Sequence, residues 1–263
     1  MIKKLLAISF LLLPVVAGFP QIIKRRIPDK LVVLTFDDAT ASQYSNVAPM
    51  LKQHGFGATF FICEFPPNSS DSLKYMNWRQ IRQLSLEGFE MANHTHTHAK
   101  LSKLDAKGMN DQLAYIENKF DSAGIPAPKT FAYPGYDLSP SVLEFLQKKG
   151  YLFARAGGSR PYDPMKDNPL LVPSWAMNAN NKDAIMEAFS QARDGKIVVL
   201  TIHGVPDTEH PWVNTPPELF REYVEYLDAN HFKVIGLADL VKYIDAVKAG
   251  KDIKPDFSAR LKN

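Results

Sequence analysis

The stretch LVVLTFDDA, from Leu31 to Ala39, is a largely apolar run that ends in two adjacent carboxylates. The run Leu31–Phe36 predicts a buried strand. Successive residues of a strand point to opposite faces, so Asp37 and Asp38 reach a common site only if the backbone turns there. Because neighbouring carboxylates repel, the pair requires a cation, a proton or water nearby. Solvated acids, or acids that cap a helix, are the simpler interpretation of such a pair.

Apolar runs that resemble strands alternate along the chain with amphipathic segments that resemble helices. After Leu31–Phe36, the strand candidates are Ala58–Ile62, Phe89–Ala92, Thr130–Tyr133, Leu152–Ala154, Lys196–Ile202 and Phe232–Ile235. The helix candidates are Val47–His54, Trp78–Leu86, Met109–Ala123, Pro140–Lys149, Asp183–Ala192, Pro216–Asn230 and Ala238–Val247. This alternation predicts an α/β protein with a parallel sheet and helices packed outside it. About seven such units favour a complete or distorted barrel, whose chemistry gathers at the carboxyl ends of the strands.

The composition of the 263-residue chain is that of an ordinary globular protein. It has 31 basic and 28 acidic residues and a formal charge of +3, with no basic stripe, so we expect no nucleic-acid partner. Its one cysteine, Cys63, excludes an internal disulfide and reads as a buried thiol within a strand.

The first residues have the layout of a secretory signal. Lys3 and Lys4 precede an apolar stretch, Leu5–Val16, and small residues follow it. We expect a signal peptide over residues 1–19, a leader over 20–29, one catalytic domain over 30–247 and a polar tail over 248–263. The apolar stretch is too short for a comfortable membrane span, although an uncleaved anchor is the alternative. The sequence therefore predicts an exported protein, periplasmic, cell-surface or secreted, with no stable membrane span after cleavage.

Three polar clusters fall at the ends of predicted strands, where a barrel would bring them to one face. They are the Asp37–Asp38 pair, the segment Asn93–His98, and His203. On a helical turn, the four-residue spacing of His94 and His98 would place both imidazoles on one side, while His96 points elsewhere. With a carboxylate from another strand end they form a metal-binding set that leaves room for water and substrate. Surface histidines are the alternative.

Together these clusters resemble a known family. The motifs TFDD ending at Asp38, HTHTH over His94–His98, and LTIH ending at His203 resemble the polysaccharide deacetylases of the NodB-homology type, carbohydrate esterase family 4. The order and spacing match over roughly residues 30 to 247. The resemblance implies a deformed (β/α) barrel, a divalent metal and an acetylated glycan as substrate, such as chitooligosaccharide, peptidoglycan or xylan.

The resemblance also assigns roles to residues. Asp38, His94 and His98 would hold the metal, usually Zn²⁺, although Co²⁺, Ni²⁺, Mn²⁺ and Fe²⁺ suit the same ligands. Asp37 would be the general base that takes a proton from the attacking water. His203 would be the general acid that protonates the leaving amine or alkoxide. The two carboxylates are then adjacent because one holds the cation and the other takes the proton.

The third family motif departs from the pattern. It contains an arginine, a proline and an aromatic–glycine pair, whereas this chain has FAYPGY over Phe131–Tyr136, with Ala132 in the place of the arginine. We expect Tyr133, Pro134, Gly135 and Tyr136 to contact the substrate, with a backbone N–H of Gly135 or Tyr136 facing the developing oxyanion. A simple proline turn is the alternative.

The fourth family motif departs as well. It contains an acid that pairs with the arginine, but here Pro173-Ser174-Trp175 has no acid. Loss of both partners indicates a divergent branch, since one alone would be an unpaired charge. Trp175 is expected to wall the acetyl-methyl pocket, or else to be a core residue. His210 and Trp212 either line the cleft or belong to a plain loop.

Two other functions remain open from the sequence. A hydrolase of a non-sugar amide could use the same fold, because the altered motifs shape the substrate side. A non-catalytic glycan-binding module is disfavoured because Asp37 and His203 are both present. A ferrous oxygenase also uses two histidines and a carboxylate, but usually on an antiparallel barrel, which the β–α alternation contradicts.

Overall fold

The computed structural model describes residues 21–65 and 71–257, so the predicted signal peptide lies outside the described residues. Within these ranges, eight strands form one parallel sheet that curls into a deformed (β/α) barrel, which confirms the predicted fold class. The strands are β1 (Leu31–Phe36), β2 (Thr59–Ile62), β3 (Glu90–Asn93), β4 (Thr130–Ala132), β5 (Phe153–Arg155), β6 (Trp175–Ala176), β7 (Val198–Ile202) and β8 (Lys233–Ile235). The strand absent from the prediction is β6, which has two residues.

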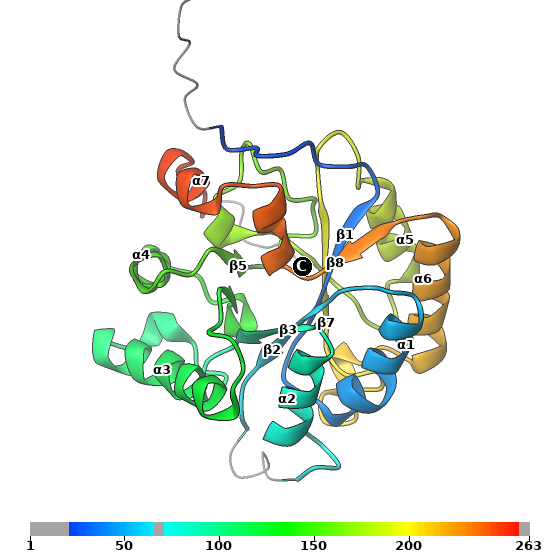
Figure 1. Cartoon of the computed structure of the whole chain (residues 1–263), viewed down its shortest axis with the longest axis horizontal. Coiled ribbons are helices and arrows are strands. Elements are labelled where there is room, and N and C mark those ends of the chain that lie inside the picture. Colours follow the sequence, from blue (N-terminus) through cyan, green and yellow to red (C-terminus); the bar gives the residue numbers. More distant parts are fainter. Residues whose placement is uncertain (1–20, 66–70, 258–263) are drawn as a thin grey trace, which may run out of the picture.

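Helices surround these strands (Figure 1). The α-helices are α1 (Ala48–Gln53), α2 (Trp78–Leu86), α3 (Ala106–Ala123), α4 (Pro140–Lys149), α5 (Lys182–Ser190), α6 (Pro217–Ala229) and α7 (Ala246–Asp252). Shorter turns are the π-helix η1 (Gln43–Val47) and the 3₁₀ helices η3 (Leu101–Lys103), η4 (Pro134–Tyr136), η5 (Pro169–Leu171), η6 (Pro211–Val213) and η7 (Ala238–Lys242). In residues 21–65 and 71–257, no helix is both long and apolar enough to cross a membrane.

Local sequence signals explain most helix boundaries. The side chains of Asn77 and Gln80 form a reciprocal capping box at the start of α2, and Gly150 ends α4 with a φ of 84°. The predictions for these two helices match the structure. The single helix predicted over Ala238–Val247 is wrong: Asp245 caps a new helix there, so η7 and α7 are separate, and α7 runs across the expected domain boundary.

Strand β1 is the centre of the sheet. It pairs with β7 over five residues, Val32 to Phe36, along one edge. Its other edge is shared, because its first half pairs with β8 and its last two residues pair with β2. The spatial order is β5-β4-β3-β2-β1-β7-β6. The shared edge of β1 is one reason why the barrel is deformed.

Residues 172–176 connect the two edges of the sheet, which are β5 and β6. The N–H of Val172 donates to the carbonyl oxygen of Ala154 at 2.9 Å, and the N–H of Ala156 donates back to the carbonyl of Val172 at 2.7 Å. Three residues later the same segment becomes β6, which pairs with β7. The connection closes the barrel at its carboxyl end.

Alternation along the strands builds two apolar layers. Val32, Leu34 and Phe36 belong to a cluster that includes residues of the surrounding helices. Leu31 and Val33 belong to a second cluster inside the barrel, which also contains residues of β2 to β5 and β7. The odd-numbered residues of β1 therefore face the barrel interior, and this parity extends to the residues that follow the strand.

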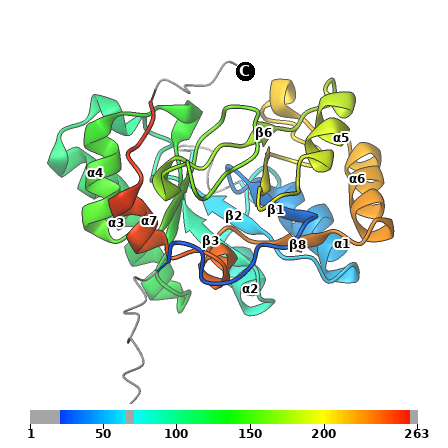
Figure 2. The same ribbon diagram turned by 90° about the horizontal axis from the view of Figure 1, so that it is seen from above.

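The first described residues run along the end of the barrel opposite to the carboxyl ends of the strands (Figure 2). Ile23 forms an isolated antiparallel bridge with Ile244, and the N–H of Lys24 donates to the carbonyl of Tyr243 at 2.7 Å. The segment expected to be a leader is thus attached to the C-terminal part of the domain.

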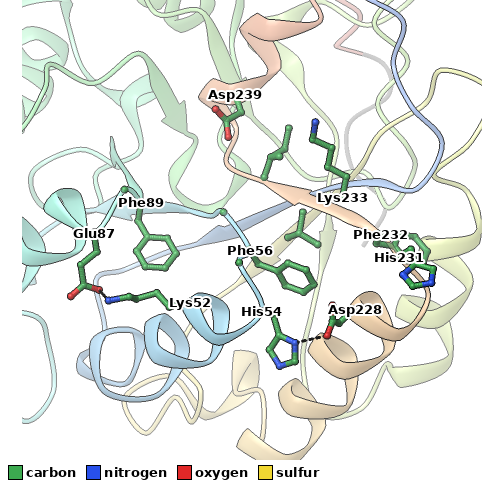
Figure 3. A pocket seen from close by; sticks show the side chains of 15 residues that line it. Lys52, His54, Phe56, Glu87, Phe89, Asp228, His231, Phe232, Lys233 and Asp239 are labelled. Carbon is green, nitrogen blue, oxygen red and sulfur yellow. Dashed lines mark hydrogen bonds and ion pairs between the residues drawn. The ribbon is translucent and has the colours of Figure 1, made fainter.

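A broad cavity of about 780 Å³ opens near the amino ends of β2 and β3 (Figure 3). Two ion pairs lie in its lining, with Lys52 3.0 Å from Glu87 and His54 2.9 Å from Asp228. Because barrel enzymes carry their chemistry at the other end of the strands, we assign this cavity no catalytic role.

Gly57, at the edge of this cavity, lies where β8 passes close to β2. A Cβ at this position would be 3.2 Å from the backbone of both Ile235 and Gly236. We expect Gly57→Ala to lower the free energy of unfolding by about 1–3 kcal/mol, because the two backbones must separate. Denaturant titration measures this. The control is Gly250→Ala in α7, where the nearest atom is 3.7 Å away; an equal loss there would contradict the explanation.

Candidate active site

The two adjacent carboxylates reach one site by different routes. Asp37 continues the alternation of β1, in which odd-numbered side chains face the barrel interior, and it is only 3% exposed. Asp38 has a φ of 73° and Ala39 a φ of 52°, so the backbone enters the left-handed region directly after the strand. This turn brings Asp38 to the side that Asp37 already faces, although left-handed φ values cost roughly 1–3 kcal/mol for residues other than glycine.

His94 follows β3 with the same inward parity and is 1% exposed. Its Nδ1 is 2.8 Å from the carbonyl oxygen of Ala132, which can only accept, so Nδ1 carries the proton. Its Nε2 therefore carries a lone pair and no proton. This atom is 3.5 Å from Oδ1 of Asp38 and has no hydrogen-bond partner among the described residues. A buried lone pair beside a carboxylate is suited to a cation.

His98 lies beside His94 because of an irregular turn, and not because of the helical turn considered for this spacing. Thr95 and His98 have φ values of 66° and 53°. The side chain of Asn93 accepts from the N–H of Thr95 at 2.9 Å, and the Thr95 hydroxyl accepts from the N–H of Ala99 at 2.9 Å, which fixes the turn. Nε2 of His98 is 3.7 Å from Oδ1 of Asp38.

The donor set of Asp38, His94 and His98 fits a divalent metal. One ligand atom from each residue lies within 4.8 Å of the other two. In a tetrahedral zinc site, bonds of about 2.1 Å place the ligand atoms about 3.4 Å apart. The distances from Oδ1 of Asp38 to Nε2 of His94 and of His98, 3.5 and 3.7 Å, are close to this value. Burial, followed by the nearby His94, lowers the pKa of His98 to about 4, although the Asp38 carboxylate acts in the opposite direction. The lowered pKa keeps the imidazole neutral and therefore able to bind a metal.

His96, between the two ligand candidates, points away from them as predicted. Its ring stacks on Tyr115 with a centroid separation of 3.5 Å, and its Nε2 is 3.5 Å from Glu64.

Asp37 has a cationic partner that the sequence analysis missed. Arg155, at the end of β5 and fully buried, donates from Nη2 to Oδ2 of Asp37 at 2.6 Å and from Nη1 to the Thr201 hydroxyl at 2.5 Å. The family arginine is absent from the third motif, as the sequence indicates, but a buried arginine from another strand is present at the site. A lone arginine ending the apolar run YLFAR at Tyr151–Arg155 was the available signal, since it shares the parity of the inward-facing Phe153.

The arginine sets the charge state of Asp37. Burial raises the pKa of this carboxyl, but Arg155, followed by His94 and His203, outweighs burial and holds the pKa below its ordinary value. Gln43, a fully buried residue of η1, donates from its amide to the backbone carbonyls of both Asp37 and His203. Asp37 is thus an ionised carboxylate in a fixed position, as a general base requires.

His203 follows β7 and faces the same site. Its Nε2 is 3.8 Å from Oδ2 of Asp38, and its Nδ1 is buried without a hydrogen-bond partner in the described part of the chain. A second imidazole, His210, lies nearby with Nδ1 3.4 Å from the buried carboxylate of Asp207 and 4.0 Å from Asp38. The loop after β7 therefore contributes two imidazoles to one centre.

These side chains open into a cavity of about 430 Å³. Asp37, Asp38, His98, Tyr133, Gly135, Tyr136, His203, His210 and Trp212 are among the residues that line it. Pro134 is buried and does not line it, and the Tyr133 hydroxyl donates to the carbonyl of Leu170 at 2.8 Å, away from the cavity. Of the third motif, Gly135 and Tyr136 thus line the cavity, and Tyr133 does so without its hydroxyl.

Trp175 does not form a wall of this cavity, contrary to the first expectation. In β6 it pairs in register with Leu200, an outward-facing residue, and it joins the cluster between the sheet and the helices. The next residue, Ala176, pairs with Thr201 and lines the cavity instead. The alternative expectation, a core tryptophan, describes its position.

Two acids and three histidines from distant motifs thus lie together at the carboxyl ends of the strands. The deformed (β/α) barrel that carries them is the fold of solved family 4 carbohydrate esterases. This chain belongs to the polysaccharide deacetylase family, whose model matches residues 24–154. The matched region contains the Asp37–Asp38 and His94–His98 motifs, whereas Arg155 and His203 lie beyond it.

A curated relative is the peptidoglycan-N-acetylglucosamine deacetylase of Bacillus cereus. It is 25% identical over 125 residues, which are 47% of this chain and 43% of that protein. The matched part is a quarter to about half of the length of the curated relatives.

Solved structures share the fold at lower identity. The Xyl-CE4 domain of a multidomain xylanase from the hindgut metagenome of Trinervitermes trinervoides has a TM-score of 0.56 at 18% identity, covering 82% of this chain and 91% of that chain. A family 4 pseudoenzyme from Bacillus anthracis has a TM-score of 0.55 at 18% identity, covering 82% of this chain and 66% of that chain. Because active and inactive proteins share the fold, function must be argued from the site.

His94→Ala removes a ligand candidate, and we expect it to lower bound Zn²⁺ measured by elemental analysis, because one carboxylate and one imidazole hold a metal weakly. His96→Ala is the matched control, since its ring faces Tyr115 rather than Asp38. Full zinc occupancy in His94→Ala, or equal loss in both variants, would contradict the assignment.

Asp207 organises the loop after β7. It accepts from the N–H groups of Gly204 at 3.0 Å and His210 at 2.7 Å. Burial raises its pKa, but the contact with His210 and these two bonds outweigh burial, so its pKa lies below the ordinary value of 3.8. Its ionised form therefore stabilises the fold above pH 3.8, and this stabilisation is lost as pH falls through the lowered pKa.

We expect Asp207→Asn to destabilise metal-free protein at pH 7 by about 1.5–3 kcal/mol, and by progressively less below about pH 4. Thermal unfolding across this pH range measures it. The control is Asp194→Asn, whose side chain is 85% exposed. A stability difference that is independent of pH would show that the charge of Asp207 is not the cause.

Proposed function

We propose that this protein is a metal-dependent hydrolase that removes N- or O-linked acetyl groups from an oligosaccharide or polysaccharide outside the cytoplasm. The observation that carries the proposal is that Asp37, Asp38, His94, His98 and His203, from three different strand ends, converge on one site. Family membership supports the same chemistry. A pseudoenzyme is disfavoured because each of these residues is present and buried or half-buried at the site.

When bound, a divalent metal, with Zn²⁺ the best match to these donors, polarises the acyl oxygen and lowers the pKa of its water. The ligands would be Asp38, His94 and His98. Asp37 is placed to take the proton of the attacking water, because Oδ2 is held by Arg155 while Oδ1 has no hydrogen-bond partner among the described residues. The free oxygen belongs to a residue that lines the cavity.

The leaving group requires a proton, and His203 lines the cavity where it can supply one. The developing oxyanion requires an N–H donor. The N–H of Tyr136 already donates to the carbonyl of Tyr133 at 3.0 Å, so the N–H of Gly135 is the better candidate of the two expected from the sequence.

The mouth of the cavity supports a carbohydrate rather than a non-sugar amide. Phe65, Tyr136 and Trp212 line it with aromatic surface, and Trp212 is 73% exposed. Trp212 is held in η6, with its ring 5.5 Å from that of His210. A large exposed indole at a polar cavity suits the apolar face of a sugar ring, which packs on aromatic side chains while its hydroxyls meet polar groups.

The test is acetate release from chitooligosaccharides, peptidoglycan and acetylated xylan by chelated and Zn²⁺-restored protein. We expect acetate from at least one glycan, only after metal is restored. Asp37→Asn is expected to retain zinc and to lower turnover on the order of 10²–10⁴-fold, because it removes the proton acceptor and keeps the shape. Zinc at full occupancy without acetate from any glycan would refute the proposal, as would unchanged turnover in Asp37→Asn.

A further inference from the structure

The structure assigns to Arg155 the positioning of the general base: we propose that its guanidinium, supplied from β5, fixes the Asp37 carboxylate, and that the hydroxyls of Thr201 and Ser174 hold the guanidinium in turn. The inference rests on the proposed function, since Asp37 is the base of that reaction. It replaces the view that this branch works without an arginine at the base.

The sheet register explains how the arginine reaches this place. Ala132, which occupies the place of the family arginine on β4, pairs in register with Arg155 on β5. Register partners of a parallel sheet project to the same face at the same level. An arginine moved by one strand therefore enters the same part of the barrel. The side chain of Ala132 is small and belongs to the interior cluster, so it leaves space for the guanidinium to cross toward β1.

The surroundings of the guanidinium direct its charge to one acceptor. Arg155 is 0% exposed, and its guanidinium carbon lies 5.5 Å from the ring centroids of both Phe61 and Tyr136. Among the residues that the structure describes, Asp37 is the one carboxylate within 4.0 Å of it. The two rings restrict the plane of the guanidinium, and the bond from Nη2 then restricts Oδ2 of Asp37.

Neutral hydroxyls pair with Nη1, the guanidinium nitrogen that does not bond Asp37. Nη1 donates to the Thr201 oxygen at 2.5 Å, so the Thr201 proton is directed to the Ser174 oxygen at 2.7 Å. Ser174 then donates to the carbonyl of Ala156 at 2.6 Å. This chain of bonds ends on the backbone directly after β5 and contains no negative charge. The ion pair of Arg155 is therefore made with Asp37, and no second carboxylate among the described residues competes for it.

The first experiment asks whether Arg155 acts through Asp37. Turnover and KM are measured for Arg155→Ala, Asp37→Asn and the double variant, each with its zinc content, on the acetylated glycan and on 4-nitrophenyl acetate. We expect Arg155→Ala to lower kcat on the order of 10²-fold at nearly unchanged KM and zinc content, because a small misplacement of a catalytic group has this effect. The double variant should turn over no slower than Asp37→Asn alone.

A merely structural role gives a different pattern. The effects of the two substitutions would then multiply, or zinc would be lost together with activity, and either result would overturn the proposal. Retention of kcat within twofold in Arg155→Ala would overturn it as well. Addition of guanidinium ion at millimolar concentration should restore part of the turnover of Arg155→Ala and none of that of Asp37→Asn.

Thr201→Val provides a test if Arg155→Ala does not fold. It is isosteric and removes the hydroxyl that bonds both Nη1 and Ser174. We expect kcat to fall about tenfold, because the guanidinium is then held less firmly and the effect of one hydrogen bond is about this size. Thr215→Val is the matched control, because Thr215 is equally buried and its hydroxyl has no partner among the described residues. Equal effects of the two substitutions would contradict the role of the hydroxyl chain.

A crystal structure of Arg155→Ala gives a readout that does not depend on turnover. We expect the Asp37 carboxylate to rotate while the positions of Asp38, His94 and His98 stay unchanged. An unmoved Asp37 carboxylate would overturn the positioning role. Absence of acetate from every glycan with wild-type protein would refute the proposed substrate, whereas ester hydrolysis by the variants would still decide the role of Arg155.

Discussion

Two adjacent carboxylates in a buried place are the constraint on which the rest of this structure depends. Asp37 and Asp38 are 3% and 4% exposed, so each needs its own positive charge. Arg155 supplies it to Asp37. Beside Asp38 are the imidazoles of His94 and His98, which with this carboxylate form a donor set suited to a cation. The left-handed turn at Asp38 separates the two carboxylates, as the proposed function requires of one acid that takes a proton and one that holds a cation.

Much of this could be predicted from the sequence, because it depends on chain-local properties. A period of two in β1 places Asp37 inward, and the same parity places His94 after β3 and His203 after β7. The end of each parallel strand is at the same face of a barrel, so three distant motifs meet there. The irregular turn at His98 could not be predicted, because side-chain bonds of Asn93 and Thr95 fix it rather than backbone propensity.

What the sequence did not reveal depends on register, which is a tertiary property. Whether Arg155 or Ala132 faces the base is decided by how β4 and β5 align, and whether Trp175 faces the cavity or the helices is decided by its pairing with Leu200. Comparison of motif positions shows that the arginine is missing from β4, but it does not show that another strand supplies one. The structure has the same positive charge on the neighbouring strand, so the electrostatic requirement is kept although the residue position is not.

The pairing of β1 with β7 has a consequence for the order of folding. Strand β1 brings both acids, but its longest hydrogen-bonded partner is β7, more than 160 residues later in the chain. Closing so long a loop is entropically unfavourable until the intervening β–α units are in place. The amino-terminal units contain Asp37, Asp38 and the groups that pair with them, and these units can form early. The pairing of β1 with β7 then completes the centre, because it brings Thr201 to the guanidinium of Arg155 and His203 to the cavity.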